Sequence, residues 1–267
     1  MLLAVDVGNT LIKLALYRGE VQVAHWYAKT DRERTPDEYA MLWNQFLGFR
    51  GFGFADVSGV AIACVVPSIT ETLRRLCREY FNHEPLEVGP GIRTGMRILY
   101  DNPREVGVDR IVAAIAAYAR HGGPSIVVAL GTATVFTAVS KEGDFLGGAI
   151  VPGVGISVEA LVQHAAQLRK VELARPPQII ARSTVAGMQA GVWYGVVGQV
   201  EEIVGRMQRE LGERAAVVAT GGYAEQIGPE CRCVDHIDPL LGLEGLRILY
   251  ERNRGAAPGE GEASQRV

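Results

Sequence analysis

The sequence predicts an α/β protein built from two similar lobes. Apolar runs of strand length alternate with segments of helical spacing along most of the 267 residues, a pattern typical of α/β folds. Two strand–turn–strand units superpose when Asp6 is aligned with Ala129, 123 residues further along the chain, and this places Ile12 on Val135. Such an offset is too long for a solenoid repeat and indicates two lobes of similar build. The chain is also long enough for two hydrophobic cores.

The first half of the chain supplies strands and helices in alternation. In chain order we expect strands at 2–5, 12–17, 21–26 and 59–67, and helices at 36–48, 68–81 and 106–121. Pro36 lies near the start of the first helix, where a residue without an N–H is well tolerated. Ser68 is the expected N-cap of the next helix, because Glu71 follows three residues later in a capping-box pattern.

The second half opens with a similar run of strands and turns, within residues 125–153. Further helices are expected at 157–168, 184–211 and 243–252. The final residues, 255–267, have the composition of a disordered tail. We therefore expect an N-terminal lobe at 1–117 and a C-terminal lobe at 118–254.

Composition argues against several functions. The hydrophobic fraction is 48%, the charged fraction 21% and the net charge −3, and the basic residues are scattered, so nucleic-acid binding is not expected. The longest apolar runs are too short to cross a bilayer, and the N-terminus lacks the features of a secretory signal, so we expect a cytoplasmic protein with no membrane partner. The cysteine spacing fits neither a disulfide framework nor a zinc site. The four cysteines are Cys64, Cys77, Cys231 and Cys233.

Polar residues interrupt the first apolar stretch at Asp6–Thr10. Glycine at such a turn lets the backbone approach a ligand closely, and successive N–H groups form a concavity that binds anions. Asp6 offers a hard oxygen ligand suited to Mg²⁺, directly or through water, and Lys13 could place a point charge on phosphates. A plain hairpin turn with Lys13 in solvent is the alternative, since such turns are often rich in Asp, Asn and Gly.

Two later turns strengthen the interpretation as a phosphate site. Gly131 and Thr132 occupy the corresponding turn of the second lobe, and Thr134 adds another hydroxyl group. A Gly-Gly turn at 221–222 ends a further apolar strand. Two such turns facing each other across a cleft would hold the phosphates of a nucleotide with its metal.

Phosphoryl transfer to a hydroxyl also needs a carboxylate that accepts the proton. Asp109 is the candidate, because it follows Gly107 at the start of a helix and stands beside Arg110. The alternatives are an Asp that stabilises its own helix N-terminus or forms a surface ion pair with Arg110. Asp144, in a turn between two strands, is expected to be solvated rather than catalytic.

The chain resembles the actin-like ATPase superfamily, whose folds are of the ribonuclease H-like type, and within it the type III pantothenate kinases. The resemblance rests on "DVGNTLIKLALY" at 6–17, "VVP" at 65–67, "NPREVGVDR" at 102–110, "GTAT" at 131–134, "GGAIVPG" at 147–153, "ST" at 183–184, "GVWYG" at 191–195 and "TGG" at 220–222. These motifs occur in the order of the family over nearly the whole chain. The resemblance implies a two-lobed kinase, with a nucleotide cleft between its lobes, that phosphorylates pantothenate from ATP in the first step of coenzyme A synthesis. It further implies Mg²⁺, a monovalent cation (K⁺ or NH₄⁺) and a homodimer.

The resemblance also assigns roles to individual residues. Those implied to bind ATP are Asp6, Val7, Gly8, Asn9, Thr10, Leu11, Ile12, Lys13, Gly131, Thr132 and Gly221. Those implied to bind pantothenate are Gly107, Val108, Asp109, Arg110 and Thr184, with Tyr100 lining the same pocket or belonging to the core. Asp109 is the implied catalytic base, and Arg110 could bind the pantothenate carboxylate through two hydrogen bonds.

One position departs from the family pattern. Family members usually carry Asp where this chain has Ala129, and that carboxylate helps to hold the monovalent cation. They also usually carry an Asp near Thr137. The cation is therefore in doubt for this chain, and one alternative follows from its loss: a regulatory protein of the same fold that binds nucleotide and has no kinase activity. Another small-molecule kinase of the superfamily is the second alternative.

Overall fold

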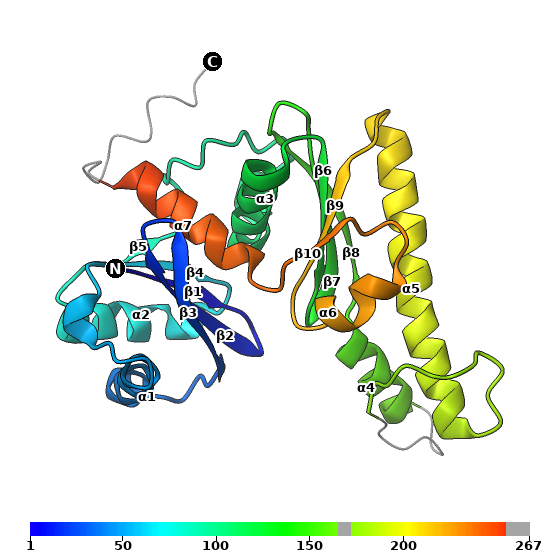
Figure 1. Ribbon diagram of the computed structural model, residues 1–267, viewed down its shortest axis with the longest axis horizontal. Coiled ribbons are helices and arrows are strands. Elements are labelled where there is room, and N and C mark those ends of the chain that lie inside the picture. The colour runs from blue at the N-terminus through cyan, green and yellow to red at the C-terminus, as the bar shows by residue number, and fades with distance from the viewer. Residues whose placement is uncertain (165–171, 255–267) are drawn as a thin grey trace. The chain divides into compact units, whose positions relative to one another are not determined.

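The computed structural model describes residues 1–164 and 172–254, which form two compact units (Figure 1). The first unit contains Met1–Met96, Asp101–Ala116 and the chain from Leu241, and the second contains Arg97–Tyr100 and Ala117–Leu240. The expected division at residue 117 therefore differs from the observed one, because residues 241–254 pack with the first unit. The expected tail, 255–267, lies outside the described residues.

The first unit is built on a five-stranded sheet in the order β3-β2-β1-β4-β5. Its strands are β1 (Leu2–Val7), β2 (Leu11–Arg18), β3 (Val21–Lys29), β4 (Gly59–Cys64) and β5 (Leu86–Glu87). Strand β2 is antiparallel to β1, whereas β4 runs parallel to β1. The carboxyl ends of β1 and β4 therefore share one edge of the sheet, where Val7 is paired with Cys64.

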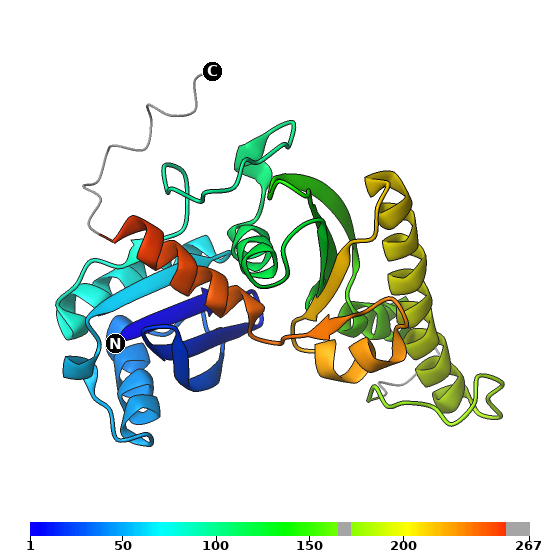
Figure 2. The same cartoon turned by 45° about the horizontal axis from the view of Figure 1, so that its top comes forward.

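Helices cover both faces of this sheet. They are α1 (Pro36–Gly48), α2 (Pro67–Leu76) and α7 (Leu241–Asn253), and the first part of α3 (Val108–His121) packs against α7 in the same unit. Helices α1 and α2 bury Trp43 and Ile69 against Val5 and Leu14 on one face. On the other face α7 packs across β1, β2 and β4 (Figure 2).

Capping chemistry explains where α1 and α2 begin. Thr35 caps α1 in a full capping box with Glu38, directly before Pro36. Helix α2 begins at Pro67 after Val66, which provides no side-chain cap, so the expected Ser68 N-cap is wrong. Proline takes the first helical position because its missing N–H needs no partner there.

The second unit repeats the sheet topology of the first. Its strands are β6 (Ser125–Leu130), β7 (Ala133–Val139), β8 (Phe145–Pro152), β9 (Ala216–Thr220) and β10 (His236–Ile237). Their order, β10-β9-β6-β7-β8, equals that of the first unit when β6 takes the place of β1. This order confirms the two similar α/β lobes that the sequence predicts.

Helices α4 (Val154–His164), α5 (Thr184–Leu211) and α6 (Ala224–Ile227) complete the second unit. Residues of α4, α5 and α6 share one core with β6, β7 and β9. Shorter helical turns lie at Phe54–Asp56, Cys77–Phe81, Pro103–Glu105 and Gly228–Glu230. The expected helix at 157–168 begins three residues earlier, at Val154, and its last four residues lie outside the described ones. No described helix has both the length and the apolar character needed to cross a membrane.

The two hairpins differ by one residue at their tips. Val7 is paired with Ile12 in the first, whereas Leu130 is paired with Thr134 in the second, so the second connection is one residue shorter. The partner of Ala129 is Val135, and the partner of Asp6 is Lys13. The constant offset that places Ile12 on Val135 is therefore wrong beyond the turn.

Residues 97–99, which are distant from β8 in the sequence, pair with β8 and extend the second sheet. The Phe145 N–H donates to the Arg97 carbonyl at 2.8 Å, and the Leu99 N–H donates to the Phe145 carbonyl at 2.8 Å. Arg97 also binds Asp144 through two hydrogen bonds, at 2.8 and 2.5 Å. Asp144 is 6% exposed, so its expected solvation is wrong: it is a buried ion-pair partner.

Candidate active site

Asp6 lies near the carboxyl end of β1, on the sheet face covered by α7. Its Oδ2 is 3.9 Å from Lys13 Nζ on the adjacent strand, and a Cβ placed on Gly242 of α7 would lie 3.5 Å from Oδ2. Burial raises the pKa of Asp6 above its ordinary value of 3.8 to about 6; the nearby Lys13 charge lowers it and the Asp109 charge raises it. A partly buried carboxylate of this kind suits a hard cation such as Mg²⁺, whose binding would favour the charged form.

The turn that follows Asp6 exposes its tip. Asn9 and Thr10 are exposed, while the Gly8 N–H donates to the Leu11 carbonyl at 3.0 Å and closes the turn. Val7 and Ile12 are fully buried in the core, so these two residues of the expected ATP motif could reach a ligand only through their backbone. The structure thus presents Gly8–Thr10 as an exposed turn that directly follows the Asp6 carboxylate, which lies close to the Lys13 ammonium group.

Asp109 and Arg110 stand in the first turn of α3, within the same unit as Asp6. Asp109 folds back over Gly107, because a Cβ on Gly107 would lie 2.5 Å from Asp109 Oδ1. The Asp109 side chain is exposed, whereas Arg110 is 9% exposed. Glycine at position 107 therefore leaves room for the carboxylate, and Asp109 is close enough to influence the pKa of Asp6.

In the second unit three glycine turns converge on the end of β6. A Cβ on Gly153 would lie 2.2 Å from the Thr132 carbonyl oxygen and 2.4 Å from that of Gly131. Gly221 adopts φ +95° and approaches the Leu130 backbone, where a Cβ would lie 2.5 Å from the carbonyl oxygen. Only glycine fits such approaches. Gly131–Thr132, Gly153 and Gly221 therefore form one backbone surface.

Ala129 lies one residue before the end of β6, in the place that Asp6 takes in β1. Its neighbours across the sheet are Val135 on β7 and Thr220 on β9. These three side chains offer one hydroxyl group and no carboxylate, so they do not fit an anionic site for a monovalent cation. Among the residues that the structure describes, no group of three or more His, Cys, Asp or Glu side chains could hold a metal ion.

Tyr100 and Thr184 belong to the second unit, whereas Gly107–Arg110 belong to the first. Tyr100 is half-buried and packs edge-on against Phe145, with ring centroids 6.3 Å apart, and its ring covers Gly147. Thr184 is exposed at the start of α5, directly after the Ser183 N-cap. Both therefore have accessible surface, as residues that line a binding site require.

Comparison with known proteins decides the family. A sequence model of the type III pantothenate kinases matches residues 2–206. The chain is 53% identical over 253 residues to the type III pantothenate kinase of Moorella thermoacetica, and 52% identical over 254 residues to that of Geobacter sulfurreducens. Each alignment covers 95% of this chain and 100% of the relative.

The chain belongs to the type III pantothenate kinase family.

Structural similarity agrees with the actin-like fold expected for a type III pantothenate kinase. The activator of the 2-hydroxyisocaproyl-CoA dehydratase from Clostridium difficile, solved with bound ADPNP, superposes with a TM-score of 0.58 at 13% identity. The match covers 94% of each chain. At this identity the likeness concerns the fold alone.

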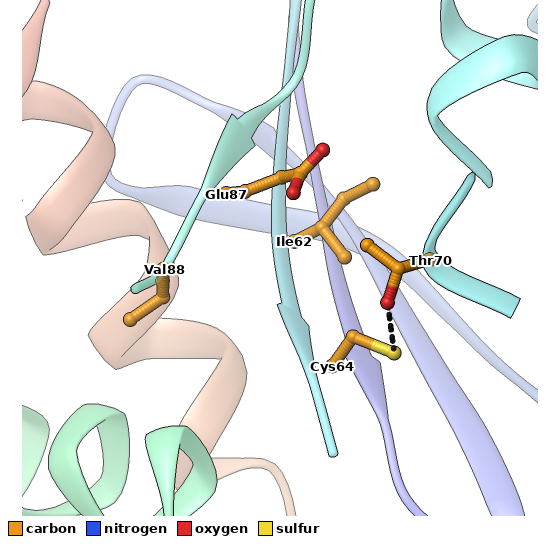
Figure 3. A pocket seen from close by; sticks show the side chains of 5 residues that line it. All are labelled: Ile62, Cys64, Thr70, Glu87 and Val88. Carbon is orange, nitrogen blue, oxygen red and sulfur yellow. Dashed lines mark hydrogen bonds between the residues drawn. The ribbon is translucent and has the colours of Figure 1, made fainter. Parts of the chain in front are cut away.

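A separate hollow of this kinase lies beside β4 (Figure 3). It is lined by Ile62, Cys64, Thr70, Glu87 and Val88. The Thr70 hydroxyl donates to Cys64 Sγ at 3.6 Å, and Glu87 is held by Arg74 through two hydrogen bonds, at 2.7 and 2.8 Å. The polar groups that line it therefore have partners within the first unit, and no glycine is among its lining residues.

Two residues that contact the candidate site of this kinase carry no signal in the sequence. Gly242 leaves space beside Asp6, and Thr30 is hydrogen-bonded to the Gly8 turn. Gly242 lies in α7, and no pattern in the sequence around it indicates that this helix packs on β1. Thr30 directly follows the edge strand β3. Threonine is common in and near strands, so this residue does not stand out in the sequence.

Proposed function

We propose that this chain transfers the γ-phosphoryl group of ATP to the primary hydroxyl group of pantothenate, the first step of coenzyme A synthesis. In this reaction the new P–O bond forms to the hydroxyl oxygen, the bond to the β-phosphate oxygen breaks, and the hydroxyl proton leaves with the base. The observation that carries the proposal is near-full-length identity of about one half to type III pantothenate kinases. The glycine turns of the family motifs accompany it, as do the acidic residues Asp6 and Asp109.

The first unit would provide the charged groups of the reaction. The Gly8–Thr10 turn would offer the Asn9 N–H to the phosphates, since the Gly8 N–H is used within the turn, and Lys13 adds a positive charge close to Asp6. Asp6 is the residue that would hold Mg²⁺, directly or through water, and the ion would offset phosphate charge when bound. Catalysis of this kind depends on positioning and on electrostatic stabilisation rather than on covalent chemistry by the protein.

Asp109 would accept the proton of the pantothenate hydroxyl group. Its side chain is exposed at the start of α3 and is not held in a core, as a residue that must reach a substrate requires. Arg110, beside it, would bind the pantothenate carboxylate through its planar guanidinium group. Tyr100 and Thr184 of the second unit are assigned to the same substrate.

In the second unit, Gly131, Thr132 and Gly221 are assigned to binding of the nucleotide. This unit also exposes several large apolar side chains, which are Leu146, Ile150, Ile156, Leu161, Ile179, Ile180 and Val185. We assign these side chains to the interface of a homodimer, since large exposed apolar surfaces are characteristic of interfaces. A cytoplasmic location completes the proposal.

The decisive experiment measures ADP release with and without pantothenate, together with mass spectrometry of the product. We expect ADP formation that depends on pantothenate and a product heavier by one phosphoryl group. Nucleotide binding without pantothenate-dependent ADP, across K⁺ and NH₄⁺ salts, would overturn the proposal in favour of a regulatory nucleotide-binding protein.

A further inference from the structure

The residue that follows β3 holds the phosphate turn at two points. The Thr30 backbone N–H donates to the Thr10 carbonyl at 3.0 Å, and the Thr30 hydroxyl group donates to the Gly8 carbonyl at 2.7 Å. Thr30 is 8% exposed and Gly8 is half-buried, so the hydroxyl hydrogen bond between them is partly shielded from water. A shielded carbonyl that loses its donor is costly, which makes the pair of bonds a strong restraint on the turn.

Thr30 is itself held in place by the core of the first unit. The hydroxyl group of Tyr39, on α1, donates to the Asp31 carbonyl at 2.6 Å and accepts from the Asp31 N–H at 3.0 Å. The Tyr39 side chain is fully buried. The residue next to Thr30 therefore cannot move without breaking two hydrogen bonds to a buried side chain.

The hydroxyl bond has a direct consequence for the tip of the turn. The Gly8 carbonyl and the Asn9 N–H belong to one planar trans peptide group, and they point in opposite directions. Because the Gly8 carbonyl is directed at Thr30, the Asn9 N–H is directed away from Thr30. The hydroxyl group of Thr30 thus sets the direction of a backbone donor that it does not touch.

In the second unit, the residue equivalent to Thr30 has no hydroxyl group. Lys29 is paired with Leu11 across β2 and β3, and Pro152 is paired with Ala133 across β7 and β8. The position equivalent to Thr30 is therefore Gly153, whose backbone lies directly against the carbonyl oxygens of Gly131 and Thr132. The residue that directly follows the third strand therefore contacts the turn in both units. Thr30 does so through its side chain, and Gly153 does so through its backbone.

We propose that Thr30 is a positioning residue of the ATP site, and that its hydroxyl group orients the Gly8–Asn9 peptide so that the Asn9 N–H faces a phosphate of the nucleotide. This inference rests on the proposed function, because it takes the Gly8–Thr10 turn as the phosphate site. Thr30 acts through the turn and contacts no substrate.

The test compares Thr30→Val, which removes the hydroxyl group at nearly the same volume, with Thr30→Ser, which keeps it. Calorimetry with Mg²⁺ and a non-hydrolysable ATP analogue measures the nucleotide Kd directly, and steady-state kinetics separates KM for ATP from KM for pantothenate. Thr70→Val is the matched control, because Thr70 carries a hydroxyl group in the same unit that hydrogen-bonds Cys64 and not the turn.

We expect Thr30→Val to raise the nucleotide Kd and the KM for ATP roughly 5- to 50-fold, the effect of one shielded hydrogen bond together with its unsatisfied carbonyl. The KM for pantothenate stays close to the wild-type value. Thr30→Ser recovers most of the affinity, and Thr70→Val leaves the Kd as in wild type. Tyr39→Phe, one step further from the turn, weakens nucleotide binding in the same direction and by less.

Two results would overturn the inference. Wild-type nucleotide affinity in Thr30→Val would mean that the hydroxyl group does not orient the turn. Equal losses in Thr30→Val and Thr30→Ser would assign the effect to packing. If the wild type binds nucleotide but releases no ADP with pantothenate, the proposed function fails while the calorimetric comparison still decides the role of Thr30.

Discussion

Asp6 and Lys13 are directly opposite each other on β1 and β2, with Oδ2 and Nζ 3.9 Å apart. The equivalent pair in the second unit is Ala129 and Val135, which carries no charge. The duplicated hairpins therefore share a backbone plan and differ in electrostatics. The charged copy offers a carboxylate with an ammonium group beside it, and the apolar copy offers backbone groups only.

Asp6→Asn is expected to separate stability from activity. Because the pKa of Asp6 is about 6 in the folded protein, against an ordinary value of 3.8 for an aspartate in the unfolded chain, the folded state binds the proton more tightly than the unfolded state. The stability of the wild type relative to Asp6→Asn therefore falls as the pH rises from about 4 to about 6, by up to about 3 kcal/mol, and is then constant. Denaturant unfolding of both proteins at several pH values measures this difference.

The same variant is expected to weaken the use of Mg²⁺-ATP and to leave pantothenate binding largely unchanged. Asparagine keeps the shape of the side chain and removes the charge that a hard cation favours. Calorimetry with each ligand gives the two affinities. Equal losses for both ligands would indicate a folding defect instead of a metal-binding role.

Asp109→Asn is expected to lower kcat by roughly two to four orders of magnitude, the usual effect of losing a general base. The side chain is exposed and the change is nearly isosteric, so the melting temperature should stay close to that of the wild type. Near-normal turnover in the variant would leave Asp109 with a structural role at the start of α3.

Ala129 leads to an unusual salt dependence. With a methyl group between Val135 and Thr220, the second hairpin lacks the carboxylate that would hold K⁺ or NH₄⁺. The initial rate of the wild type should therefore change little across a KCl titration at constant ionic strength, and Ala129→Asp should become activated by K⁺. Ala129→Asn is the uncharged control. Steep, saturating activation of the wild type at low KCl concentration would refute the prediction.

Gly153→Ala is expected to disturb the backbone surface formed by Gly131–Thr132, Gly153 and Gly221 in the second unit. Its Cβ would lie 2.2 Å from the Thr132 carbonyl oxygen, so the turn must shift, at a cost of about 1 to 3 kcal/mol in the free energy of unfolding. Nucleotide affinity should fall with it. Gly155→Ala, whose Cβ would lie 3.6 Å from the Tyr223 hydroxyl oxygen, is the matched control and should not weaken the fold. Similar losses in both variants would contradict the argument.

The parts of the fold that carry a local signal could be predicted from the sequence. Helix α1 occupies the expected residues 36–48, and α5 occupies 184–211, because apolar spacing and caps mark both. Strands β5 and β10 have two residues each, too few to show a period. The segment 97–100 joins the second sheet through backbone hydrogen bonds, which leave no pattern in the side chains.

In the candidate site, too, only the residues with a local signal could be predicted from the sequence. The Asp6–Thr10 and Gly131–Thr132 turns stood out because glycine and hydroxyl residues interrupt apolar strands. The one-residue difference between the two tips did not, because the sequence on either side of each turn is equally apolar. Thr30 and Gly242 act on the site through tertiary contacts, and only the packed structure reveals them.

Helix α7 completes the first unit late in the synthesis of the chain. It is synthesised after the whole second unit, yet it packs on β1 and β4, and Gly245 lies so close to Val112 that a Cβ would be 1.9 Å from the Val112 carbonyl oxygen. The emerging chain can thus complete the second unit while one face of the first sheet, with Asp6 on it, still lacks its cover. The sheet face that carries Asp6 therefore gains this cover only once residues 241–253 have been synthesised.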